Sequence, residues 1–391
     1  MPFFFETHDN SLNPRKQKLS ASPKNLEMKP SFGLITEVPI DFEDQYSDVF
    51  PRPRAYMVSI PSIPNCICSA EPYNQQPDLL KLEEMWCRVL KRQSSPQGKN
   101  WYPSVFCVSL RGCRERETSC FAQFHKSGLC RLAAMFSTER PDAQKLLSKF
   151  DVRSPGAFGC GQSHKYTADW IARHLPLSKH ENVMILEDDF KFLKGWQDHL
   201  PYLANFFALN EDQTSAKNWE IFFLGHFPYW GYPVHGLQVW RVWSVMTHAF
   251  LLSEKGRKHI QEWDHVSICR EMKDVAAIDD WIRLTFTGYA YSPQFIIQNP
   301  KIPSQISKGI QAKDRKPWDL SIEWTQVHAN ALEKMGTFAD LLMMIEIPLL
   351  CIICFILFLL LVSSIWTRFA PPPPPPHFPQ VKTTLAKNEI F

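Results

Sequence analysis

The chain has 391 residues, of which 45% are hydrophobic, and a formal net charge of only +3 at pH 7. This composition provides enough apolar side chains for a sizeable core and excludes a largely disordered protein. No Lys/Arg-rich stripe interleaved with aromatic residues occurs, so nucleic acid is not an expected partner. The 11 cysteines follow no repeating spacing and the N-terminus lacks secretory-signal features, which indicates reduced thiols rather than a disulfide framework.

The first 100 residues are rich in proline, serine, asparagine and charge, with interrupted apolar runs. Such a composition buries little apolar surface, so residues 1–100 are predicted to be poorly ordered or loosely packed. Residues 79–91 are an exception, because their helical periodicity predicts a helix that could pack on the main domain. The globular domain is expected at residues 101–312.

An α/β unit is predicted at the start of the globular domain. Residues 105–110 are typical of a strand, and a helix that follows is predicted to end at Gly128. Arg111 and Arg114 lie between the two, with Arg116 beside them. These arginines either meet a phosphate or ribose of a ligand, or form a solvated helix start.

A glycine-rich segment, residues 156–164, is predicted to be a loop that precedes a helix. Ser163 and His164 would then lie at the helix start, where backbone N–H groups can face an anion. A tight loop with a serine cap and a structural histidine is the alternative explanation.

The most suggestive stretch is an apolar run, residues 183–186, that leads into Glu187, Asp188 and Asp189. The run predicts a buried central strand, and open α/β sheets bind ligands beyond the carboxyl ends of their strands. Three adjacent carboxylates repel one another, and a divalent cation that also holds a diphosphate would offset this cost. A solvated acidic turn is the alternative.

Later elements follow from the same periodicities. Helices are predicted at 196–209 and from residue 255, and strands at 219–224 and 289–298, while residues 239–252 hold aromatic side chains and Arg241. Asp279 and Asp280 form a second carboxylate pair ahead of a short helical stretch. This pair is either catalytic or a helix N-cap.

The C-terminal region is predicted to contain a connector (313–346), a transmembrane helix (347–366) and a proline-rich tail (367–391). The uncharged, almost wholly apolar run at 347–365, at ~1.5 Å per residue, spans about 28 Å, close to the hydrocarbon thickness. A buried core helix is the alternative. Without a signal peptide, a span this close to the C-terminus favours a cytosolic catalytic domain, although the basic residues after the span favour the opposite orientation.

The order of these motifs resembles glycosyltransferase family 25, which includes lipooligosaccharide and procollagen galactosyltransferases. The resemblance covers about residues 105–310, and each block is weak alone. The matching blocks are residues 105–116, 156–164, 184–190, 247–256, 278–281 and Gln298.

The resemblance implies a GT-A type fold, a Rossmann-like twisted mixed sheet flanked by helices, which binds a nucleotide sugar with Mn²⁺ (or Mg²⁺). It implies that Asp188 and Asp189 hold the metal and that Asp279 or Asp280 is the catalytic base or binds the acceptor. The donor-binding residues that it implies are Arg111, Arg114, Ser163, His164, Glu187 and Asp188.

The expected function is therefore metal-dependent, inverting transfer of a hexose, galactose or glucose, from a nucleotide sugar such as a UDP-hexose. The acceptor hydroxyl would belong to a glycan, a lipid-linked glycan or a protein. A catalytically inactive, membrane-anchored module of the same fold, binding a glycan or a protein, is the main alternative. A phosphate-ester hydrolase is less favoured, because no second set of His/Asp ligands has a recognisable spacing.

Overall fold

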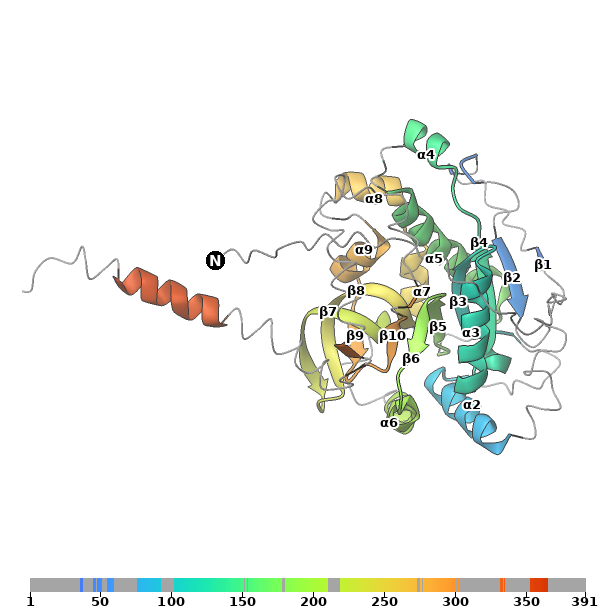
Figure 1. Cartoon of the computed structure of the whole chain (residues 1–391), viewed down its shortest axis with the longest axis horizontal. Coiled ribbons are helices and arrows are strands. Elements are labelled where there is room, and N and C mark those ends of the chain that lie inside the picture. The colour runs from blue at the N-terminus through green and yellow to red at the C-terminus, as the bar shows by residue number, and fades with distance from the viewer. Residues whose placement is uncertain are drawn as a thin grey trace, which may run out of the picture.

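The computed structural model has an α/β architecture, in which a large mixed sheet is flanked by helices on both faces (Figure 1). This confirms the coarse fold class expected from the sequence. The structure describes residues 36–37, 45–46, 48–50, 55–59, 76–92, 102–150, 152, 154–177, 180–209, 219–272, 275, 277–299, 301–302, 331–332, 334 and 352–364.

The main sheet has eight strands in the order β1-β2-β4-β3-β5-β8-β7-β9. Strands β4, β3 and β5 are parallel, whereas β8 runs antiparallel to β5, and β2 runs antiparallel to β4. The strands are β1 (Thr36–Glu37), β2 (Ala55–Ser59), β3 (Val105–Leu110), β4 (Ala133–Thr138), β5 (Val183–Glu187), β7 (Ile221–His235), β8 (Val239–Leu252) and β9 (Gly288–Tyr291). A separate antiparallel pair joins β6 (Phe190–Phe192) to β10 (Ile296–Gln298).

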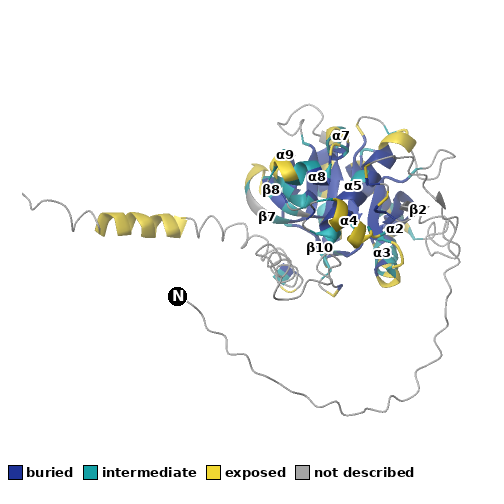
Figure 2. Ribbon diagram, turned by 90° about the horizontal axis from the view of Figure 1, so that it is seen from above, coloured by how far each residue is buried: buried dark blue, intermediate teal, exposed yellow. Residues whose placement is uncertain are grey.

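The central strands are buried on both faces, which explains their almost continuous apolar sequences. In β5, Met184 and Leu186 belong to one core cluster, whereas Val183 and Ile185 belong to the cluster on the opposite face. Figure 2 shows these strands buried at the centre of the molecule. The predicted strands at 105–110 and 183–186 are therefore confirmed.

Helices cover both faces of the sheet. The first cluster receives side chains from α2, α3 and α6, and the second receives them from α4, α5, α7, α8 and α9. The helices are α2 (Pro77–Val89), α3 (Arg114–Ser127), α4 (Ala143–Lys149), α5 (Pro155–His174), α6 (Leu200–Leu209), α7 (Glu254–Ile260), α8 (His265–Glu271) and α9 (Ile278–Thr285), with 3₁₀ turns at Cys130–Leu132 and Trp196–His199.

The predicted helix at 79–91 is present as α2, and it is anchored in the core. Trp86 is fully buried and its indole N–H donates to the carbonyl oxygen of Ser127 at 2.9 Å. Glu83 accepts two hydrogen bonds from Arg131, at 2.8 and 2.6 Å. The strand β2 also pairs with β4, so both segments contribute to the same fold as residues 102–302. Most of residues 1–100 lie outside the described part of the chain.

The glycine-rich segment is not a loop, and the prediction for it was wrong. Helix α5 already begins at Pro155, because Ser154 caps it by accepting a hydrogen bond from the Ala157 N–H at 3.3 Å, and proline suits the first helical turn. Ser163 and His164 therefore lie inside the helix. Glycine allows close packing at position 161, because a Cβ there would lie 2.5 Å from the indole nitrogen of Trp263.

The single strand predicted at 289–298 is two strands in different sheets. Pro293 lies between β9 and β10, and a proline lacks the N–H that a continuous ladder requires. The chain turns there and β10 pairs with β6, so that Gln298 lies opposite Phe190. This pairing brings the end of the domain to the acidic residues that precede β6.

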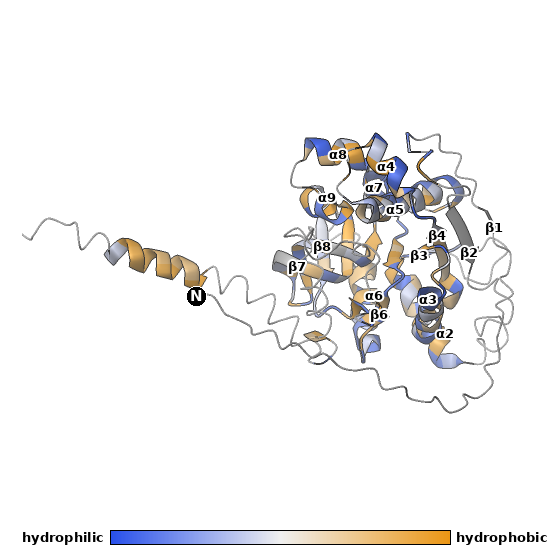
Figure 3. Ribbon diagram, turned by 45° about the horizontal axis from the view of Figure 1, so that its top comes forward, coloured by the Kyte–Doolittle hydropathy of each residue, from blue (hydrophilic) through white to orange (hydrophobic). Residues whose placement is uncertain are grey.

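Near the C-terminus, residues 352–364 form a helix whose apolar side chains are exposed, as Figure 3 also shows by their hydropathy. Among the residues that the structure describes, no helix is both long enough and apolar enough to cross a membrane. The rest of the predicted span, and the tail after it, lie outside the described residues. The span at 347–366 therefore stays a prediction.

Most described cysteines are free, including Cys107, Cys120 and Cys160, but Cys130 is disulfide-bonded. The expectation of reduced thiols is thus wrong for Cys130. The location of the domain stays a prediction.

Candidate active site

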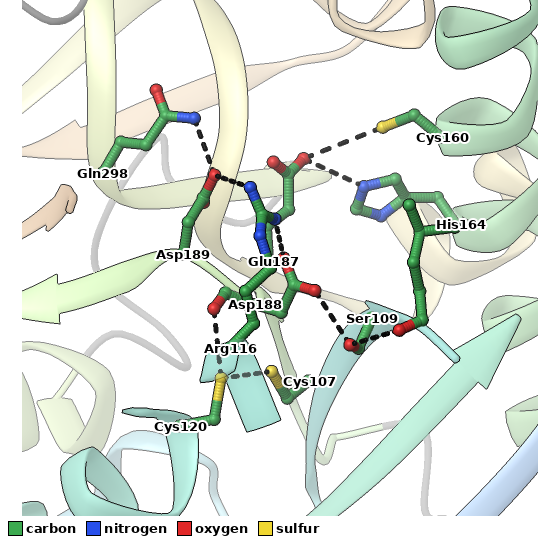
Figure 4. Close-up of polar contacts among 11 residues, drawn as sticks. Cys107, Ser109, Arg116, Cys120, Cys160, His164, Glu187, Asp188, Asp189 and Gln298 are labelled. Carbon is green, nitrogen blue, oxygen red and sulfur yellow. Dashed lines mark hydrogen bonds and ion pairs between the residues drawn. The ribbon is translucent and has the colours of Figure 1, made fainter. Parts of the chain in front are cut away.

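Polar side chains gather where the parallel strands β3, β4 and β5 end and where the antiparallel β8 passes beside them. Glu187, the last residue of β5, lies opposite Val108 of β3, and Leu186 lies opposite Ala249 of β8. Ser109 and Thr247 therefore flank the acidic triplet from the two neighbouring strands. Figure 4 shows this group together with side chains from α3 and α5.

Asp188 is buried and both of its carboxylate oxygens are engaged. One oxygen pairs with the guanidinium of Arg116, and the other accepts a hydrogen bond from Ser109 at 2.8 Å. Its backbone carbonyl oxygen accepts a bond from the Cys120 thiol at 3.2 Å. Burial raises the pKa of Asp188 despite the nearby cation. These contacts are typical of a structural carboxylate. The predicted metal-binding and donor-binding roles of Asp188 stay predictions.

Asp189 is only 3% exposed, but one of its two carboxylate oxygens makes fewer contacts than the other. Its Oδ2 accepts a hydrogen bond from Gln298 at 2.8 Å and lies 3.7 Å from Arg116. Its Oδ1 has no hydrogen-bond partner among the described residues. Burial, with repulsion from Glu187 and Asp188, raises the pKa of Asp189 to about 7. A free, buried carboxylate oxygen of this kind is an available cation ligand.

Arg116 has a role that the sequence analysis missed. It reaches both aspartates from α3 and is itself 7% exposed. The sequence holds a signal for this role: Arg116, Cys120 and Phe124 occupy the buried stripe of α3 at a spacing of four residues. A charged residue in such a stripe indicates a buried ion pair.

Glu187 lies on the more open side of the triplet. Its Oε1 accepts a hydrogen bond from Thr247 at 2.5 Å and lies 3.3 Å from Nε2 of His164. The thiol of Cys160 lies 3.9 Å from the same oxygen. Burial alone would raise the pKa of Glu187, but the bonds from His164 and Thr247 outweigh it and lower the pKa.

The second carboxylate pair belongs to the same electrostatic environment. Asp279 and Asp280 lie in the first turn of α9, whose N-cap is Ala277, so the N-cap alternative is wrong. Asp279 is half-buried; burial, with repulsion from Asp280 and Glu187, raises its pKa to about 6. Asp280 forms a looser ion pair with Arg283 at 3.7 Å.

Two predicted donor-binding residues, Arg111 and Ser163, have other contacts, and a third, Arg114, is exposed. Arg111 pairs with Glu139 at 2.9 Å near the surface, and Arg114 is exposed at the start of α3. The hydroxyl of Ser163 donates to the carbonyl oxygen of Gly159 at 2.7 Å and lies 2.6 Å from that of Thr138. Their donor-binding roles stay predictions.

Two buried histidines, His248 near Glu187 and His226 near His248, were not singled out as site residues. Nε2 of His248 lies 3.4 Å from the carbonyl oxygen of Ile296, and burial lowers the pKa of His248 to about 4. Burial also lowers the pKa of His226 to about 3. Both rings are therefore neutral at pH 7. A Cβ at Gly225 would lie 2.5 Å from the His248 ring, so only glycine leaves enough space at position 225.

A scan against protein-family models finds no match to the chain, and a search of curated proteins finds none either. The likeness to glycosyltransferase family 25 therefore depends on the sequence motifs alone.

Proposed function

We propose that the protein transfers a hexose from a nucleotide sugar to an acceptor hydroxyl, and that the carboxyl edge of the sheet is its active site. The observation that carries the proposal is the convergence of two carboxylate groups from separate elements. Glu187 ends β5 and Asp279 lies in the first turn of α9; burial raises the pKa of Asp279, and repulsion from Asp280 and then from Glu187 adds to this shift. Paired carboxylates with different pKa values are typical of acid–base sites.

Asp279 is the proposed base. It is half-buried, and a pKa of about 6 leaves it mostly ionised at pH 7 while making it more basic than an ordinary aspartate. It would accept the proton of the acceptor hydroxyl as the hydroxyl oxygen bonds to the anomeric carbon and the nucleoside diphosphate departs. Asp280 donates its backbone N–H to Asp279 at 3.2 Å and helps to orient that carboxylate.

A divalent cation fits Asp189 better than Asp188. The Oδ1 atom of Asp189 has no partner among the described residues, whereas both oxygens of Asp188 are engaged. Mn²⁺ or Mg²⁺ bound there would neutralise the departing diphosphate. Glu187, two positions earlier in the sequence and on the more open side of the triplet, is the second candidate ligand.

The finer fold assignment, GT-A, belongs to this proposal. The parallel strands β4, β3 and β5, with the antiparallel β8 beside them, support it, as does the position of the acidic triplet at the carboxyl end of β5. The acceptor class follows only from the resemblance: a glycan, a lipid-linked glycan or a protein. An anchor at residues 347–366 would place the reaction at a membrane surface.

A donor screen tests the proposal. The full chain is incubated with UDP- and GDP-hexoses, with and without Mn²⁺, and donor hydrolysis and transfer are measured. We expect one donor to be turned over only with the metal, and Asp189→Asn to abolish this turnover while the protein stays folded. Asp198→Asn, at an exposed position, is the matched control. Undiminished turnover in Asp189→Asn would exclude the metal role of Asp189.

One observation favours the inactive binding module as a second candidate. Arg116 pairs with Asp188 and lies 3.7 Å from Asp189, so part of the buried negative charge is balanced without any ligand. An absence of turnover and of nucleotide-sugar binding across the screen, measured by calorimetry, would favour this module.

A further inference from the structure

Cys160, His164 and Glu187 form a cluster of side chains that can bind a metal ion. The proposed transfer reaction gives no role to this cluster as a whole. The two α5 residues are four positions apart, so they lie on one face of the helix, and Glu187 meets them from the end of β5. One ligand atom from each of the three side chains lies within 4.8 Å of the other two. Figure 4 shows both α5 side chains pointing at the Glu187 carboxylate.

The spacing of the three atoms is close to that of a tetrahedral metal site. With zinc bonds of about 2.0–2.3 Å, ligands at tetrahedral corners lie about 3.4 Å apart for nitrogen and oxygen and about 3.6 Å apart for sulfur and oxygen. The observed separations are 3.3 Å from His164 Nε2 to Glu187 Oε1 and 3.9 Å from Cys160 Sγ to the same oxygen. For these two pairs, shifts of a few tenths of an ångström would suffice, and the ligand atoms of Cys160 and His164 lie within 4.8 Å of each other.

The surroundings hold two of the ligands in place. The Thr247 hydroxyl donates to Glu187 Oε1 at 2.5 Å and orients the carboxylate from outside the cluster. The imidazole of His164 is buried and packs against the ring of Phe250, with centroids 5.7 Å apart. Cys160 and Glu187 are half-buried, so an ion and a water molecule can reach the cluster.

The ligand set selects the kind of metal. A thiolate, an imidazole and a single carboxylate suit zinc, whereas Mn²⁺ and Mg²⁺ favour sites made of oxygen atoms. We propose that Cys160, His164 and Glu187 bind a zinc-class divalent cation, with water in the fourth position. On binding, the Cys160 thiol releases one proton to solvent, and the neutral His164 ring binds through Nε2 with its hydrogen on Nδ1.

The site shares only Glu187 with the diphosphate metal site proposed above, and its other two ligands, Cys160 and His164, come from α5 rather than from the acidic triplet. It also requires no nucleotide sugar, so it can be tested whether or not the protein is a transferase. Because Glu187 is one of its ligands, the ion lies at the carboxyl edge of the sheet, beside the proposed donor pocket.

The test uses Co²⁺ as a spectroscopic probe that occupies zinc sites. The full chain is titrated with Co²⁺, and the thiolate-to-cobalt charge-transfer band is followed, after which Zn²⁺ is added to displace the cobalt. We expect one equivalent of Co²⁺ to give the band and Zn²⁺ to remove it. Cys160→Ser should abolish the band, and Cys113→Ser, at another half-buried cysteine, should retain it.

Two further variants test the geometry. Glu187→Gln should weaken cobalt binding, and Thr247→Val should weaken it by about 10- to 100-fold, because it removes the bond that orients the carboxylate. Thermal unfolding of each apo variant verifies that it is folded. Absence of the band in the unsubstituted protein, or an equal band in folded Cys160→Ser, would overturn the proposal.

Discussion

The two carboxylate regions at the edge of the sheet differ in how their charges are stabilised. Asp188 and Asp189 are buried beneath a guanidinium that is itself buried, whereas Asp279 and Asp280 are half-buried, and Asp280 lies 3.7 Å from the partly exposed Arg283. In the first region Arg116 balances part of the buried charge, mainly that of Asp188, whereas the second region keeps its charge near solvent. We infer from this comparison that the two pairs of adjacent aspartates have different roles. The role of the first pair is more structural, and that of the second is chemical.

The largest expected effect comes from removing the buried cation. Arg116→Met should destabilise the protein by about 3–5 kcal/mol, because it leaves the carboxylates of Asp188 and Asp189 buried without a cationic partner. The free energy of unfolding is measured by chemical denaturation at pH 7. Arg114→Met, at an exposed position of the same helix, should change it by less than about 0.5 kcal/mol. Equal effects of the two changes would contradict the structural role of Arg116.

A smaller effect is expected at the helix that supplies Cys160 and His164. Gly161→Ala should cost about 1–3 kcal/mol, because the new methyl group would lie 2.5 Å from the indole nitrogen of Trp263. At Gly159 the nearest atom would be 3.2 Å away, on the side chain of Pro141, and the cost should be smaller. Thermal or chemical unfolding of the two variants compares them. A greater loss at Gly159 would show that close packing does not explain the glycines.

The smallest stability change is expected at α9, and its sign is opposite. The pKa of Asp279 is raised to about 6, so its favourable contribution to stability is complete below about pH 3.8 and is lost as pH rises through 6. Asp279→Asn should therefore stabilise the protein at pH 8, by about 1 kcal/mol after allowing for solvent screening. The difference should disappear near pH 4. Unfolding curves measured at both pH values test this, and a destabilised variant at pH 8 would contradict it.

Strongly patterned elements could be predicted from the sequence. The apolar runs that became β3 and β5 are buried on both faces, and the helix ending at Gly128 has that glycine in the left-handed region, at φ 70°. The position of the acidic triplet at the end of β5 was also predicted. These features depend on local patterns of apolar residues and on one residue with special backbone freedom.

Contacts between distant residues could not be predicted in the same way. The glycines of α5 were interpreted as a loop because their partners, such as Trp263, lie about a hundred positions away in the sequence. Arg116 was interpreted only as part of a basic cluster, since its pairing with Asp188 depends on the packing of α3 against the sheet. The contact of Cys160 and His164 with Glu187 likewise depends on where α5 crosses the end of β5.

The most direct test of the proposed active site compares Asp279→Asn with Asp280→Asn. For the best donor and acceptor, kcat is measured from pH 5 to pH 8, with folding verified for each variant. The unsubstituted protein should gain activity as pH rises through about 6, when Asp279 ionises, and Asp279→Asn should lose about 10²–10⁴-fold in kcat and this pH dependence. Asp280→Asn should retain the pH dependence with a smaller loss. A fully active Asp279→Asn variant with an unchanged pH profile would contradict the assignment of the active site.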